Sequence, residues 1–329
     1  IPVTYVAAMG RASRDGVLIK GGIYLEELGR LRAIALDKTG TLTHGRPELT
    51  EIHPLDGRDP DQLLTFAATA ERRSEHPIAR AIVRAADARN LTIGEPDTFH
   101  AAVGGGIHAR IDGTDLTIAS PDYTTSQGHD LDPAVTTVIE DLESNGNTTV
   151  VMADPTGPLA VLAVADTIRP QAADTIHRLR ALGVKHITML TGDNPRTARA
   201  IATRAGIDHV DASLKPEDKA ARIRQLVDEH HHVAMVGDGI NDAPPLAAAS
   251  VGIAMGTAGS DIALETADVA LMADDLTRLV TAITIGRRTR RVVTQNLVLS
   301  LIILAALVPT ALLGVIGLPA AVLAHELSE

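Results

Sequence analysis

Three short apolar runs, each followed by polar residues and then by a helical pattern, constrain the fold of this chain most. They cover residues 31–36, 186–190 and 232–236. Strands that alternate with helices form parallel sheets, because each helix carries the chain back to the end of the sheet where the next strand starts. Ligands of such sheets bind at the carboxyl ends of the strands. The sequence therefore predicts an α/β fold with a doubly wound parallel sheet.

The pattern changes between residues 49 and 161, where a helix pair is followed by short alternating strands. The helix pair is expected over 61–90, and the strands over 108–111, 116–119 and 149–153. A separate pattern inside an α/β chain indicates an inserted α+β domain. The sheet domain is predicted to consist of residues 31–48 and 162–284, and the inserted domain of residues 49–161. Residues 1–30 are expected to form the end of a membrane helix and a stalk. Residues 285–329 are expected to form membrane helices, the last of them truncated.

Residues 298–316 read VLSLIILAALVPTALLGVI and contain no charged side chain. A helix of this length is long enough to cross a bilayer core. Arginines at 287, 288, 290 and 291 precede this run, as is typical of the cytoplasmic end of a spanning helix. We expect a multi-pass protein of the cell membrane, in contact with the lipid bilayer, whose catalytic domains are cytoplasmic. The alternative is a buried helix of a soluble domain.

Composition excludes several classes of function. The chain of 329 residues has no cysteine, which excludes disulfides, thiolate zinc sites and cysteine nucleophiles. Aromatic residues make up only 2%, and the formal charge is −11, so platforms for base stacking are scarce and a polyanion is repelled. No nucleic acid partner is expected.

The sequence DKTGTLT at residues 37–43 follows the first predicted strand. An aspartate at a strand end can attack a phosphoryl group, and a lysine and threonine hydroxyls can offset the transferred charge. This heptad resembles the phosphorylation signature of P-type ATPases, membrane pumps whose catalytic core has the haloacid-dehalogenase fold. TGDN at 191–194, LKPEDK at 214–219 and GDGINDAP at 237–244 resemble further motifs of the same family.

The resemblance implies ATP and Mg²⁺ as cofactors and an aspartyl-phosphate intermediate on Asp37. It implies that Lys215 neutralises the phosphoryl group, and that Asp242 supports the magnesium ligands. The implied catalytic residues are Asp37, Lys38, Thr39, Thr191, Gly192, Asp193, Lys215, Asn241 and Asp242, and the implied magnesium-binding residues are Asp37, Thr39 and Asp238. Related phosphatases have a general acid/base aspartate where Thr39 stands, so a long-lived phosphoenzyme is expected. Taken separately, Asp238 and Asp242 could instead belong to a helix N-terminus.

SEHP at 74–77 and GGG at 104–106 resemble the nucleotide site of the heavy-metal subclass of these pumps. The resemblance implies that Glu71, His76, Gly104 and Gly106 bind ATP. Ala119 departs from the family, which usually has glycine there, and its methyl group is expected to crowd the pocket. The alternative is that the histidine and the glycines have only structural roles in turns.

His325 and Glu326 follow a second apolar run, 318–323, and resemble the His-Glu pair of cobalt- and zinc-type pumps. Imidazole with carboxylate suits a divalent transition metal, so Zn²⁺, Co²⁺ or Cd²⁺ is the expected transported ion. A polar helix end at the membrane interface is the alternative. The resemblance covers the carboxyl-terminal half of a pump, so an amino-terminal half with an actuator domain is expected as a further partner.

The function expected from this resemblance is ATP-driven transport of a divalent transition metal by a P-type ATPase. Two other classes remain open from the residues alone. One is a soluble haloacid-dehalogenase-type phosphatase, against which the uncharged span 298–316 and Thr39 speak. The other is a nucleotide-sensing regulatory module, against which the set Asp37, Thr191, Lys215 and Asp238 speaks.

Overall fold

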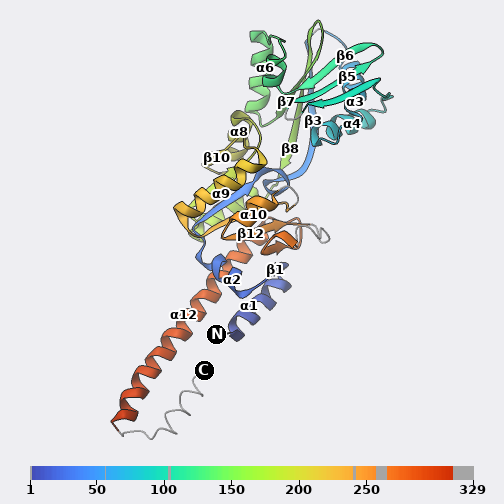
Figure 1. Ribbon diagram of the computed structural model, residues 1–329. Coiled ribbons are helices and arrows are strands. Elements are labelled where there is room, and N and C mark those ends of the chain that lie inside the picture. Colours follow the sequence, from blue (N-terminus) through green and yellow to red (C-terminus); the bar gives the residue numbers. More distant parts are fainter. Residues whose placement is uncertain (1, 56, 103–104, 240–241, 257–264, 314–329) are drawn as a thin grey trace. The chain divides into compact units, whose positions relative to one another are not determined.

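The computed structural model describes residues 2–55, 57–102, 105–239, 242–256 and 265–313 (Figure 1). The chain divides into two compact units. The first consists of Ile1–Ile34, Arg178–Lys185 and Arg222–Glu329, and the second of Ala35–His177 and His186–Ala221.

The predicted parallel sheet is present. It has seven strands, of which β1-β13-β12-β11 lie in the first unit in that order and β9-β10 lie in the second, while the division between the units falls inside β2, after Ile34. β11 pairs parallel with β12, β12 with β13, and β9 with β10, whereas the edge strand β1 is antiparallel to β13. The strands are β1 (Val17–Ile19), β2 (Ala33–Asp37), β9 (His186–Leu190), β10 (His209–Asp211), β11 (Val233–Gly237), β12 (Val251–Met255) and β13 (Val269–Leu271).

Helices alternate with these strands, as a doubly wound sheet requires. They are α1 (Pro2–Arg14), α2 (Gly22–Arg30), α7 (Ala172–Ala181), α8 (Pro195–Ala205), α9 (Pro216–His230), α10 (Ala243–Ala248) and α12 (Thr277–Leu312). The strands β2, β11 and β12 are buried along their whole length, which explains why their sequences are continuously apolar and do not alternate.

The second unit also contains an antiparallel sheet of six strands in the order β3-β8-β7-β6-β5-β4. Its strands are β3 (Thr43–Pro54), β4 (Thr98–Ala102), β5 (Gly106–Ile111), β6 (Thr114–Ala119), β7 (Thr148–Asp154) and β8 (Gly157–Ile168). Its helices are α3 (Pro60–Glu71), α4 (Pro77–Ala88), α5 (Pro121–Ser126) and α6 (Pro133–Ser144). The expected α+β region thus has both its helix pair and its strands. The domain boundaries at 48/49 and 161/162, which fall within β3 and β8, stay predictions.

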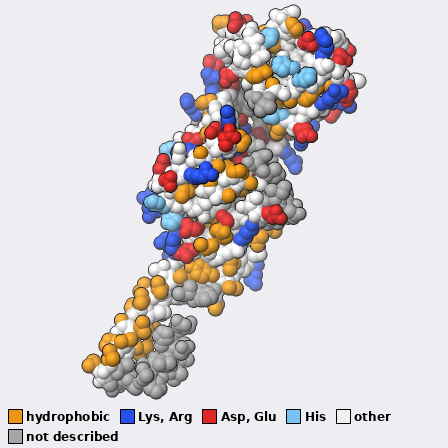
Figure 2. Space-filling model, in the orientation of Figure 1, with side chains coloured by type: hydrophobic (Ala, Val, Ile, Leu, Met, Phe, Trp, Pro, Cys, Tyr) orange, Lys and Arg blue, Asp and Glu red, His pale blue; other side chains and the backbone are white. Residues whose placement is uncertain are grey.

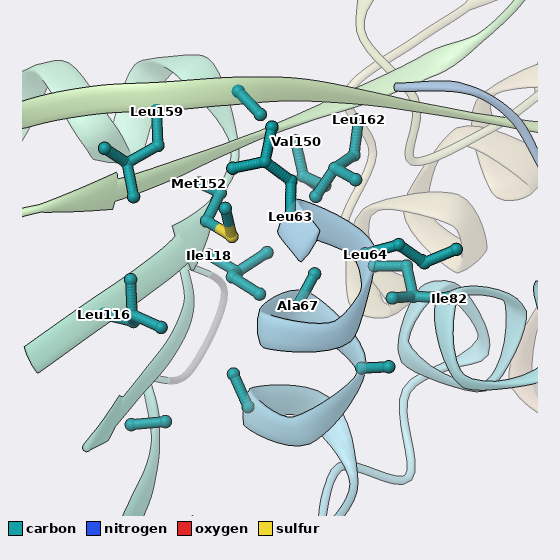
Figure 3. Packing of buried hydrophobic residues seen from close by; sticks show 14 of the residues in the cluster. Leu63, Leu64, Ala67, Ile82, Leu116, Ile118, Val150, Met152, Leu159 and Leu162 are labelled. Atoms are coloured by element: carbon teal, nitrogen blue, oxygen red, sulfur yellow. The ribbon is translucent and has the colours of Figure 1, made fainter. Parts of the chain in front are cut away.

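Side chains of this sheet alternate between two apolar cores, because successive residues of a strand point to opposite faces. Val150 and Met152 of β7 pack with Leu63 and Ile82 from α3 and α4, as Figure 3 shows. Val151, between them, packs against α6 in a second cluster. With few aromatic residues available, aliphatic side chains fill both cores.

In the first unit, α12 crosses α2 at two glycines. A methyl group on Gly29 would lie 2.8 Å from the carbonyl oxygen of Gly286, so the close approach of the two helices requires glycine there. The Arg287 guanidinium donates a hydrogen bond of 3.2 Å to the Leu31 carbonyl oxygen. The base of α12 is thereby fixed to the residues that lead into β2.

Among the described residues, α12 is the one helix long and apolar enough to cross a membrane, over Thr277–Thr310. Large hydrophobic side chains such as Leu301 and Ile302 are exposed along it, and Figure 2 shows apolar side chains gathered on this helix. The alternative of a buried helix in a soluble domain is therefore wrong for the described residues. The apolar residues near the amino terminus form α1, a helix of 13 residues.

Candidate functional site

Asp37 is the last residue of β2, and its side chain is almost completely buried. The Lys219 ammonium group donates a hydrogen bond of 2.5 Å to Asp37 Oδ1. Burial of a carboxylate is costly unless a cation and hydrogen bonds compensate it. Lys219 supplies that compensation, and the pair sits at the carboxyl end of a parallel strand, where ligands of such sheets bind.

The turn after Asp37 is held by glycine and by a buried arginine. Gly40 has φ +74°, a left-handed conformation that glycine adopts at low cost. Arg169 is 2% exposed and donates hydrogen bonds to the carbonyl oxygens of Thr41 at 2.8 Å and Gly40 at 3.1 Å. Thr39 directly precedes Gly40 and is exposed. The turn thus presents one hydroxyl to solvent next to a buried carboxylate.

The residues after β9 approach the same turn. Asp193 Oδ2 lies 2.6 Å from the Lys38 ammonium nitrogen, and the Asp193 amide donates to the Thr191 hydroxyl oxygen at 3.1 Å. Thr191 is buried, whereas Gly192 is exposed and a methyl group there would lie 3.3 Å from the Leu214 carbonyl oxygen. Lys38 is therefore engaged by Asp193, one strand away, and holds the two turns together.

Lys219, and not the expected Lys215, pairs with Asp37. Lys215 precedes α9, its side chain is exposed, and its amide donates to Asp218 at 3.2 Å. Lys219 is the fourth residue of α9 and is half-buried. Both lysines occur in LKPEDK, but Lys215 precedes the helix whereas Lys219 lies in its first turn. The helix turns the side chain of Lys219 toward the sheet and leaves Lys215 at the exposed start of the helix.

In the first unit, Asp238 follows β11 and is half-buried, and Asp242 is almost completely buried. A methyl group on Gly237 would lie 2.5 Å from Asp242 Oδ2, so glycine makes room for this carboxylate over the strand end. Asp242 precedes α10, yet its side chain makes no capping hydrogen bond to that helix in the described chain. Asp242 thus occupies the N-cap position of α10, as the alternative interpretation expects, but its carboxylate does not cap the helix. Asn241 lies outside the described residues.

The expected nucleotide residues lie in the second unit. Glu71, at the end of α3, is 6% exposed, and its burial raises the pKa of the carboxyl to about 7. The neighbouring Ser74 hydrogen-bonds this carboxyl and opposes the rise. His76 caps α4 by accepting a hydrogen bond at Nδ1 from the Ile78 amide at 3.3 Å, and desolvation of the ring lowers the pKa of His76.

Gly106 begins β5 with φ +151°. A methyl group on it would lie 2.3 Å from the Ile118 carbonyl oxygen and 2.7 Å from the Ala119 side chain. Ala119 pairs with Gly106 across the two strands and is buried. Ala119, at the position where the family usually has glycine, thus places its methyl group directly beside Gly106. Gly104, His325 and Glu326 lie outside the described residues.

Comparison with known proteins agrees with this arrangement. Residues 31–250 match the model of the haloacid dehalogenase-like hydrolases. The chain is 44% identical to a probable cadmium-transporting ATPase of Alkalihalophilus pseudofirmus over 92% of its own length, and 45% identical to a zinc/cadmium/lead-transporting P-type ATPase of Escherichia coli over 98%. It covers 42% and 43% of these relatives, so it spans less than half their length.

A solved structure gives the same result in three dimensions. The chain is similar to a zinc-transporting PIB-type ATPase in its E2.Pi state, with a TM-score of 0.74 and 44% sequence identity. The similarity covers 99% of this chain and 53% of the solved one. The predicted haloacid-dehalogenase-like fold and the resemblance to heavy-metal P-type ATPases are both confirmed.

Proposed function

The chain belongs to the haloacid dehalogenase-like hydrolases, with heavy-metal P-type ATPases as relatives, and from this premise we propose that it is the catalytic half of an ATP-driven metal pump. Asp37 is proposed as the residue that is phosphorylated. The observation that supports this most is the buried Asp37 carboxylate at a strand end, with the Lys219 ammonium group at 2.5 Å.

The proposed reaction is in-line phosphoryl transfer from ATP. A bond forms between an Asp37 carboxylate oxygen and the γ-phosphorus, while the bond to the bridging oxygen breaks and ADP leaves with that electron pair. Lys219 is placed to offset charge on the transferred group, and the hydroxyl of Thr191 is a candidate donor to it. Lys38 keeps its ion pair with Asp193 and so holds both turns in place. Thr39 lacks the carboxylate that would catalyse hydrolysis, which favours accumulation of the phosphoenzyme.

Magnesium is the proposed metal cofactor. Mg²⁺ prefers few carboxylates, with water and phosphate oxygens completing its coordination. Asp37, Thr39 and Asp238 are proposed to bind it, and the chemistry it supplies is neutralisation of phosphate charge. The donors fit, because all are oxygen groups. Asp242, packed over Gly237, is proposed to orient the strand end that carries Asp238.

ATP is proposed to bind at the six-stranded sheet, near Glu71, His76 and the glycines at 104 and 106. Support comes from the narrow approach at Gly106, where a side chain would meet the backbone of β6. Burial raises the pKa of the Glu71 carboxyl to about 7, so about half of it is uncharged at neutral pH, and we propose that this buried carboxyl lies beside the base of ATP.

Transport of Zn²⁺, Co²⁺ or Cd²⁺ across the cell membrane is proposed for the whole protein, together with an amino-terminal half that carries an actuator domain. The exposed apolar surface of α12 supports a position in the lipid bilayer. His325 and Glu326 are proposed metal ligands. Metal-stimulated ATP hydrolysis in His325→Ala and Glu326→Ala tests them, and unchanged metal dependence in both variants would remove the basis for this class of ion.

Labelling with [γ-³²P]ATP and Mg²⁺ tests the proposed phosphorylation. The expected label is stable in acid, released by hydroxylamine, and absent in Asp37→Asn. Asp115→Asn is the control, because this carboxylate is exposed and pairs with Arg110 on another part of the unit. Label that persists in Asp37→Asn would contradict the assignment, and label that hydrolyses within milliseconds would favour a phosphatase.

A further inference from the structure

Glu143 is a buried carboxylate that the proposed reaction does not use. It lies in the last turn of α6, is 5% exposed, and both of its oxygens are engaged. Oε1 accepts hydrogen bonds of 3.0 Å from the Thr149 hydroxyl and from the Asn194 side-chain amide. Oε2 accepts a hydrogen bond of 2.8 Å from the Arg196 guanidinium. A buried carboxylate with three donors is costly to disturb, because each donor would lose its partner.

Asn194 connects this carboxylate to the start of α8. Its Oδ1 accepts hydrogen bonds from the amides of Arg196 at 3.0 Å and Thr197 at 2.9 Å, while its Nδ2 donates to Glu143. The Asn194 amide is fixed in one of its two flip orientations, because its oxygen must accept these hydrogen bonds and its nitrogen must donate one. The negative charge of Glu143 also lies near the N-terminus of α8, where the helix dipole favours an anion.

A second contact ties the same two segments together. The Thr197 hydroxyl donates a hydrogen bond of 2.7 Å to the carbonyl oxygen of Asn147, in the loop after α6. The Asn147 side chain in turn donates to the Leu142 carbonyl oxygen at 2.9 Å and accepts from Thr50 at 2.8 Å. Hydrogen bonds thus join the end of α6 and the loop after it to α8 at two points, and Asn147 holds that loop in place.

The start of α8 immediately follows the turn that reaches Lys38. Asp193, next to Asn194 in the chain, forms the ion pair with Lys38, and Lys38 is next to Asp37. We propose that Glu143 is a positioning residue for phosphoryl transfer, acting through Asn194 on the Thr191–Asp193 turn. This rests on the proposed function, in which that turn and Asp37 receive the phosphoryl group. Displacement of reacting groups by about 1 Å can cost two orders of magnitude in rate.

The chain offers a matched control. Glu140 is also on α6 and also pairs with Arg196, at 2.8 Å, but it is exposed, and this contact involves Arg196 and not Asn194. Glu143→Ala removes the contact to Asn194, Glu143→Gln keeps the shape and an acceptor oxygen, and Glu140→Gln removes only the outer pair. Loss of an ion pair alone would affect both positions, whereas positioning of the turn would affect only Glu143.

The test measures the rate of phosphoenzyme formation at saturating ATP, the ATP concentration for half-maximal rate, and amide exchange at residues 193, 194, 196 and 197. Glu143→Ala is expected to slow phosphorylation by roughly tenfold or more, with the half-maximal ATP concentration within about twofold of wild type. Glu143→Gln is expected to recover part of the rate. Exchange at the Arg196 and Thr197 amides should be faster in Glu143→Ala and unchanged in Glu140→Gln.

The inference is overturned if folded Glu143→Ala and Glu143→Gln both phosphorylate at the rate of Glu140→Gln. It is also overturned if saturating ATP restores the rate, since the effect would then be on nucleotide affinity alone. If Glu143→Ala does not fold, Glu143→Gln decides the matter by the same two measurements. Absence of label in the unmodified protein contradicts the proposed function instead, and amide exchange at Arg196 and Thr197 then decides whether Glu143 orders Asn194 and the start of α8.

Discussion

Lys219 donates a hydrogen bond of 2.5 Å to Asp37, although 182 residues separate the two in the chain. Lys38, the immediate neighbour of Asp37, instead lies 2.6 Å from Asp193. The two lysines therefore have different tasks. Lys219 is placed to compensate the carboxylate at the strand end, and Lys38 links the turns that follow β2 and β9.

Lys219→Ala is expected to reduce the rate of phosphoenzyme formation by about two orders of magnitude, because it removes the cation beside the attacking carboxylate. Lys215→Ala is the matched control, from the same segment, and is expected to remain within about twofold of wild type. Rapid-quench labelling with ATP measures both rates. A larger loss in Lys215→Ala than in Lys219→Ala would indicate that Lys215 neutralises the phosphoryl group.

Arg169→Ala is expected to destabilise the turn after Asp37 by about 2–4 kcal/mol, since it leaves the Gly40 and Thr41 carbonyl oxygens without this donor in a buried setting. Arg110→Ala, which breaks an exposed ion pair with Asp115, is expected to cost less than about 1 kcal/mol. Urea denaturation followed by circular dichroism measures both. Equal losses in the two variants would show that Arg169 contributes no more than a surface arginine.

The raised pKa of the Glu71 carboxyl predicts that the stability of the fold depends on pH. Burial raises the pKa of its carboxyl from 4.5 to about 7 in the folded protein, so the folded state binds the proton more tightly than the unfolded state. The carboxyl of Glu71 therefore contributes stability that is fully present below about pH 4.5 and is lost as the pH rises through 7, where the buried group ionises. Its size is on the order of 3 kcal/mol.

Glu71→Gln is expected to remove this part of the pH dependence, so that the variant gains on wild type in free energy of unfolding between pH 5 and 8. Glu75→Gln, at an exposed position in the following loop, is the control and should follow the wild-type curve. Chemical denaturation at a series of pH values gives the comparison. A constant difference between wild type and Glu71→Gln across this range would refute the raised pKa.

Gly106→Ala is expected to destabilise the six-stranded sheet by about 2–4 kcal/mol, because the methyl group meets the Ile118 carbonyl oxygen and the backbone has positive φ. Gly113→Ala lies in the next turn, also at positive φ but with open space around it, and is expected to cost only about 1 kcal/mol. The difference between the unfolding midpoints of the two variants measures the destabilisation that comes from the steric clash at Gly106. Similar midpoints would mean that β6 shifts freely to accept the methyl group.

Several elements follow from local pattern alone. The predicted strand at 186–190 is β9, and the helix pair expected over 61–90 is α3 and α4. Their helix starts are visible in the sequence, since proline occupies the first position of both and Asp59 and His76 act as caps. The position of Asp37 at a strand end follows from the same kind of pattern, because an apolar run stops there.

Partners across long sequence separations do not follow from pattern. The motif LKPEDK contains two lysines with equal chemistry, and only the start of α9 at Pro216 decides which one turns toward Asp37. Arg169 looked like any other charged residue in sequence, yet its guanidinium is buried against the Gly40 and Thr41 carbonyls.

The sequence by itself determined the chemical groups of the site and the strand ends that carry them, because strand and helix periods are local properties of the chain. The tertiary structure decided which of those groups meet. Glu143, at the end of α6, and Asn194, at the start of α8, are 51 residues apart and come within 3.0 Å only through the packing of separate elements. Such contacts depend on how helices and strands pack in three dimensions, and no spacing in the sequence encodes that packing.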